Sequence, residues 1–99
     1  MYAIGMIHLG ALIGAPKYKN NFEQILHNAL YELQILEESG FDAAIVENFN
    51  DTPYTTEQNL ETIIQFTRIF SILKEQSKIN LGVNIQYTNT DIEMIVASL

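Results

Sequence analysis

The stretch "GFDAAIVENFNDTPY", residues 40–54, begins like the interior of a protein and ends like its surface. Phe41 to Val46 is, apart from Asp42, an apolar run of strand length, and Glu47 and Asn48 follow it directly. A short strand that is apolar on both faces is typical of a parallel sheet. Because ligands bind at the carboxyl ends of the strands in such sheets, the abrupt polar exit places Glu47 and Asn48 where a site is expected.

The rest of the chain alternates between the two periods that distinguish strands from helices. Residues 2–9, "YAIGMIHL", and residues 79–85, "INLGVNI", are short apolar runs and predict two further strands. From Phe22 to Leu36 the apolar residues recur at steps of three and four, which predicts a helix. A second helix is predicted over about residues 56–76, and a third begins near Thr90.

Local signals mark the ends of these helices. Asn20 or Asn21 can cap the first helix, because a side-chain oxygen there accepts an otherwise unpaired backbone N–H. Gly40 stands where a helix commonly ends in a left-handed residue. Thr55 and Gln58 have the spacing of a capping box ahead of the second helix.

The β-α-β-α-β-α order predicts an α/β fold with a parallel sheet and right-handed crossovers. If the strands lie in sequential order, all helices cover one face and the other face is bare unless the sheet closes into a barrel. A doubly wound order would cover both faces but usually needs more strands. Under either arrangement we interpret residues 1–99 as a single, partial domain.

Composition excludes several classes of protein. The chain has 99 residues, a formal net charge of -7, and only five scattered basic residues, so nucleic acid is not an expected partner. The absence of cysteine excludes a disulfide scaffold and agrees with the reducing cytoplasm. The apolar N-terminus mimics a secretory signal, but no Lys or Arg precedes it, His8 interrupts it, and no apolar run is long enough to span a membrane.

Four polar residues at predicted strand ends are the candidate site: His8 after the first strand, Glu47 and Asn48 after the second, and Asn84 in the third. Each also has an ordinary structural explanation, as a hydrogen-bonded core histidine, a paired carboxylate, a loop cap, or a strand-end amide. His27, on the first helix, is expected at the surface.

His8 and Glu47 have the chemistry of a general acid and base pair. The same two side chains are also potential ligands of a divalent metal, but two ligands do not make a metal site, so this signal is weak, and no cofactor can be named. A phosphate-binding loop of Walker spacing and a serine nucleophile elbow are both missing from the sequence.

Three segments together resemble the BtpA/SgcQ family: "IGMIHLGALIGAP" (4–16), "GFDAAIVENFNDTPY" (40–54) and "LGVNI" (81–85). The resemblance covers almost the whole chain but only the first three βα units of a family member. It implies a TIM (β/α)8 barrel of the ribulose-phosphate-binding type, incomplete at 99 residues. The residues that match the motifs of the family are His8, Gly10, Pro16, Glu47, Asn48, Asp51, Pro53 and Asn84.

The sequence departs from the family pattern at two places. Ile13 stands where proline is common, and "QYTNT" follows Ile85 where an Arg-Asn-Asp or small-residue run is frequent. The second departure weakens any anion-binding role for the third loop.

Three functions remain open. The resemblance implies a role in the biogenesis or stability of a membrane complex, which is photosystem I for the best-known member. The strand-end residues instead favour an enzyme acting on a small phosphorylated or carbonyl substrate, with Glu47 as base, His8 as acid or metal ligand, and Asn84 orienting the substrate. A truncated, non-functional product is the third reading. In each case we expect self-association, or the remainder of a barrel, to cover the open sheet.

Overall fold

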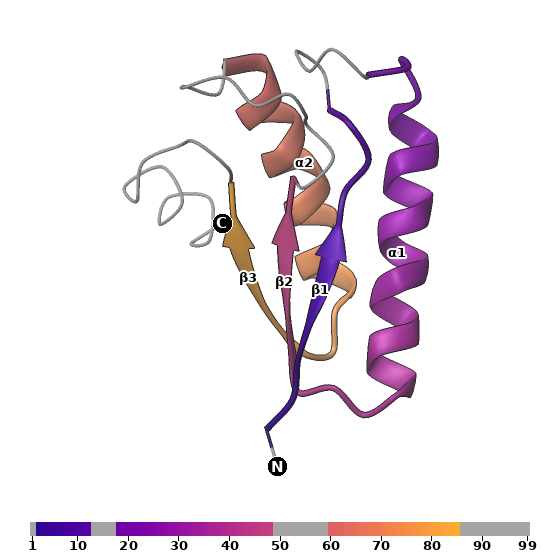
Figure 1. The fold of residues 1–99 in the computed structure, drawn as a ribbon, viewed down its shortest axis with the longest axis vertical. Helices are drawn as coiled ribbons and strands as arrows, with labels where there is room; N and C mark the ends of the chain where they lie inside the picture. The colour runs from indigo at the N-terminus through magenta and orange to yellow at the C-terminus, as the bar shows by residue number, and fades with distance from the viewer. Residues whose placement is uncertain (1, 13–17, 49–59, 86–99) are drawn as a thin grey trace.

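The computed structural model describes residues 2–12, 18–48 and 60–85, which form a layer of parallel strands with helices packed against it (Figure 1). The elements in chain order are β1 (Ile4–His8), α1 (Phe22–Glu38), β2 (Ala43–Glu47), α2 (Leu60–Gln76) and β3 (Asn80–Asn84). This order confirms the predicted α/β class and the alternation of strands with helices. The predicted third helix and the Thr55–Gln58 capping box lie outside the described residues.

The strands form one three-stranded sheet in the order β1-β2-β3, and both pairings are parallel. The structure therefore has the sequential order and not the doubly wound one. Two right-handed crossovers in sequential order place both helices on the same face of the sheet. In Figure 1, α2 runs behind the sheet and α1 lies beside β1. These are consecutive βα units of the kind that barrels repeat, while the closed barrel stays a prediction.

The core lies between the sheet and the two helices. Ile7 and Val46 point to this side and are completely buried, as are Phe66 and Phe70 of α2. α1 contributes Ile25 and other residues of its predicted apolar stripe. On the opposite face, Ile4 is 54% exposed and Met6 is 42% exposed. The exposure alternates along β1, which fixes which side of the sheet carries the core.

The structure contradicts the prediction for the N-terminal end of α1 and confirms the one for its C-terminal end. Asn21 occupies the cap position, but its side chain makes no capping hydrogen bond, so the predicted side-chain cap is wrong. Asn21 has ψ of 46°, away from the extended conformation that directs a cap oxygen back to the first turn, and its backbone carbonyl instead accepts the Ile25 N–H at 3.1 Å. Asn20 has a positive φ of 54°, which asparagine tolerates better than most residues.

The prediction for Gly40 at the other end of α1 is confirmed. Gly40 has φ of +85°, and its N–H bonds the Glu37 carbonyl while the Phe41 N–H bonds the Leu36 carbonyl. This pair of bonds is the Schellman motif, which satisfies carbonyls that the helix leaves unpaired. The turn releases the chain directly into β2.

We predict that Gly40→Ala lowers the free energy of unfolding by about 1 kcal/mol, because an L side chain is strained at positive φ. For a chain of this size that is a fall in melting temperature of roughly 4–8 °C in a thermal unfolding experiment. Gly82→Ala is the matched control, since its added Cβ would lie at an ordinary 3.8 Å from Ile45. Equal melting temperatures for the two variants would contradict the assigned role of Gly40.

Candidate functional site at the carboxyl edge of the sheet

His8, Glu47 and Asn84 are the last residues of β1, β2 and β3, and the parallel pairing places them in one row across the sheet. His8 is the register partner of Glu47, and Glu47 is the register partner of Asn84. His8 lies two residues after Met6, and Glu47 and Asn84 lie two residues after the register partners of Met6 on β2 and β3. Side chains two residues apart on a strand point to the same face. All three therefore share the exposed face of Met6, which the helices leave uncovered.

The side chains of this row contact one another. His8 Nε2 lies 3.5 Å from Glu47 Oε2, and Asn84 Nδ2 donates a hydrogen bond of 3.2 Å to Glu47 Oε1. The Glu47 side chain is only 10% exposed, whereas that of His8 is 42% exposed. A carboxylate with so little access to water is costly unless it is paired, and partners from both neighbouring strands supply that pairing. We call His8, Glu47 and Asn84 the carboxyl-edge triad.

Asn48 is placed apart from the carboxyl-edge triad. It follows Glu47 directly, is completely buried, and by the alternation of an extended chain belongs to the opposite face of the sheet. Its role as a site residue therefore stays a prediction, and it cannot contact a ligand on the triad's face without rearrangement. His27 is exposed on α1, as the sequence predicted.

Glu32 is a further acidic group near the triad that the sequence reasoning missed. It lies on α1, three residues after the buried Ala29, and its Oε2 is buried without a hydrogen-bond partner. Burial raises the pKa of Glu32, and the charge of His8 partly opposes that rise. The sequence signal for this residue was its position, because Glu32 is a carboxylate within the apolar stripe of α1.

The triad combines a proton acceptor, a proton carrier and an amide on one surface. A carboxylate beside an imidazole can pass a proton to and from a bound molecule, and an amide can orient a carbonyl or hydroxyl group. Within residues 2–12, 18–48 and 60–85, no group of three His, Cys, Asp or Glu side chains is placed to hold a metal ion. Neither described helix is long and apolar enough to cross a membrane.

The fold and the row of polar strand ends define a parallel α/β protein with its candidate site at the carboxyl edge of the sheet. The BtpA family profile matches residues 2–98, and the chain belongs to this family. This confirms the resemblance seen in the sequence.

Relatives of known sequence add little about activity. An uncharacterized protein of Methanocaldococcus jannaschii is 43% identical over 82 residues, covering 83% of this chain and 31% of the relative. An uncharacterized protein of Pyrococcus furiosus is 38% identical, covering 82% of this chain and 31% of the relative. The putative sgc region protein SgcQ of Escherichia coli K12 is 32% identical, covering 83% and 31%. The chain thus spans about a third of the length of these relatives, and no solved structure matches it.

We predict that Glu32→Gln raises the melting temperature at pH 7. The raised pKa of Glu32 means that its ionised form destabilises the folded chain, and this penalty disappears as the pH falls through the folded pKa toward the ordinary glutamate value of 4.5. The gain from Glu32→Gln should therefore shrink as the pH falls toward 4.5 and be absent at lower pH in a series of thermal melts.

Glu75→Gln, at an exposed position of α2, controls for the loss of one negative charge. A gain of the same size in both variants would show that the net charge, and not the burial of Glu32, sets the effect.

Proposed function

We propose that the chain supplies the first βα units of a (β/α)8 barrel of the ribulose-phosphate-binding type, and that the carboxyl-edge triad belongs to its ligand site. Three observations support this: family membership, the sequential parallel sheet, and an uncovered sheet face that carries apolar side chains below the triad. Such a barrel takes about 250 residues. The relatives have room for it, because the aligned segment is 31% of their length.

The chemistry that the triad supports best is proton transfer on a small carbonyl or phosphorylated molecule. Glu47 acts as the general base, because its carboxylate is desolvated and held from both sides. His8, the more exposed partner, carries the proton to or from the substrate. Asn84 holds the Glu47 carboxylate through its Nδ2, which leaves its Oδ1 to orient a substrate donor.

The single observation that carries this proposal is the double contact of Glu47. A carboxylate with a polar partner beside each oxygen is held in orientation, which general-base catalysis requires. A phosphate group would be held elsewhere, because barrels of this type bind phosphate in loops near their last strands.

We predict that Glu47→Gln in the complete protein lowers turnover by at least ~100-fold, because the base is lost. Gln keeps an acceptor oxygen for the Asn84 amide, so the melting temperature should change little. Turnover and binding of phosphorylated aldehydes and ketones are the measurements.

Glu61→Gln, on the exposed side of α2, is the matched control for the charge. If Glu47→Gln retains full activity while a substrate is turned over, Glu47 is not the base and the enzymatic proposal fails.

A second candidate function is the assembly or stabilisation of a membrane complex, photosystem I in a photosynthetic source. Family membership is the observation that favours it. Deletion of the complete protein should then reduce the level of such a complex, and the complex subunits should co-purify with it. Unchanged levels after deletion would end this proposal. A cytoplasmic location fits both functions and stays a prediction.

A further inference from the structure

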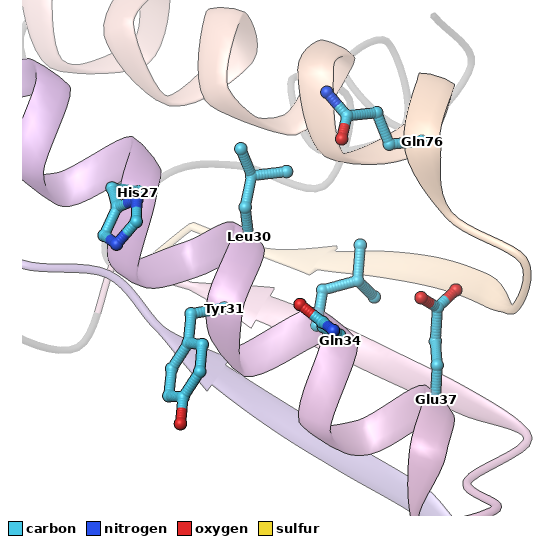
Figure 2. Close-up of a pocket in the computed structure, with 7 residues that line it drawn as sticks. His27, Leu30, Tyr31, Gln34, Glu37 and Gln76 are labelled. Carbon is cyan, nitrogen blue, oxygen red and sulfur yellow. The ribbon is translucent and has the colours of Figure 1, made fainter.

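A groove of about 300 Å³ between α1 and α2 ends where α1 is joined to the start of β3 (Figure 2). The groove is lined by residues of both helices, among them Glu37 near the end of α1. The Glu37 carboxylate accepts the backbone N–H of Lys78, two residues before β3, so this contact anchors the start of the strand. The groove lies apart from the carboxyl-edge triad, because Asn84 stands at the other end of β3.

The uncovered face of the sheet is uneven in the row of residues directly below the triad. Met6, Ile45 and Gly82 are register partners in this row, and each stands two residues before a triad member. Met6 is 42% exposed and Ile45 is half-buried, whereas Gly82 has no side chain. The surface is therefore lowest on β3, directly below Asn84. We call the space over the Gly82 backbone, beside the Ile45 side chain, the Gly82 notch.

Gly82 lacks the structural reasons that the other described glycines have. A Cβ on Gly5 or Gly10 would lie only 2.7 or 3.2 Å from a side chain of α1, and Gly40 has positive φ. Gly82 has no positive φ, and among the described residues a Cβ there would have only Ile45 Cγ1 within 4 Å, at 3.8 Å.

The place of Gly82 in the sheet favours one of the remaining explanations for a glycine inside a strand. Such a glycine weakens the strand, and it often marks a bulge or a place where a ligand approaches the backbone closely. The pairing of β2 with β3 is continuous through Gly82, which excludes a bulge. The close approach of a ligand fits, because the Gly82 notch adjoins the carboxyl-edge triad.

We propose that Gly82 determines which substrate the triad accepts, by leaving the notch open for a hydroxymethyl-sized group on the reacting carbonyl carbon. The inference rests on the proposed enzymatic function and names its substrate class, small hydroxyketones. The carbon atom of this group takes the place that a Cβ would occupy, in van der Waals contact with Ile45. Met6 and Ile45 occupy the rest of the row, and side chains fill the interior of such barrels, so only one small group fits below the triad.

Asn84 selects a hydroxyl on the same group. Its Nδ2 donates to Glu47, so its Oδ1 is the atom that can accept a hydrogen bond from the substrate. Residues two apart on a strand are separated by about 7 Å, so a hydroxyl on a carbon in the notch lies within reach of the Asn84 side chain. The carbonyl group of the substrate then lies toward β2, beside the Glu47 base.

The test compares two ligands that differ by one group. Dihydroxyacetone phosphate carries a hydroxymethyl group on its carbonyl carbon, and glycolaldehyde phosphate has a hydrogen atom in its place. In calorimetric titrations the complete protein should bind the ketone more tightly than the aldehyde. Gly82→Ala should weaken binding of the ketone by roughly tenfold or more, the effect of one methylene group in a fitted pocket. Binding of the aldehyde should not change, because the aldehyde leaves the notch empty.

Ala43→Ser is the matched control. Ala43 stands on the same face of β2 but four residues before Glu47, and the change adds one heavy atom, as Gly82→Ala does. It should leave the affinity for both ligands unchanged. The melting temperature of each variant shows whether the added atom disturbs the fold.

Unchanged ketone binding in Gly82→Ala, or an equal loss of affinity for the two ligands, would overturn the inference. A lowered melting temperature with the preference for the ketone intact would assign the notch to a side chain from the rest of the barrel, and would overturn it as well. Binding of neither ligand to the wild-type protein would have the same consequence. In each case the proposed function is judged separately, by the loss of turnover in Glu47→Gln.

Discussion

The register of the parallel sheet is the constraint on which the rest of the structure depends. A slip of one residue in either pairing would turn every side chain of that strand to the opposite face. Ile7 and Val46 are completely buried against the helices, so a slip would expose one of them and bring a polar neighbour into the core. The burial of these two residues therefore fixes where His8, Glu47 and Asn84 emerge. The position of the candidate site follows from hydrophobic packing on the other side of the sheet.

Glu47 links this packing to chemistry. As the last residue of the central strand it has neighbours on both sides, and it is the only member of the triad that can contact both others. Its near-complete burial would be unfavourable without the His8 and Asn84 contacts, so the fold and the site support each other. Glu32, on α1, shows the opposite situation: a buried carboxylate oxygen with no hydrogen-bond partner and a pKa raised by burial.

Sequence reasoning was most successful where local chemistry decides the outcome. The helix period of α1, the apolar run of β2 and the glycine at position 40 each depend on neighbouring residues alone, and each is confirmed. It also located the strand ends that carry the triad, because parallel strands share one carboxyl edge. It could not decide which face each strand end uses, since a strand that is apolar on both sides gives no direction; Asn48 was grouped with Glu47 for this reason. The groove lined by residues of α1 and α2 could not be predicted from the sequence, because its shape depends on how the two helices pack.

The central claim is that Glu47 contacts His8 and Asn84 on one face of the sheet. The most direct test is a NOESY spectrum of the ¹⁵N- and ¹³C-labelled chain, read for the side-chain protons of Glu47. We predict cross-peaks from the Glu47 methylene protons to the His8 ring protons and to the Asn84 side-chain amide. Cross-peaks from Glu47 to residues of α1 or α2 in their place would put the carboxylate on the helical face and contradict this arrangement of the site.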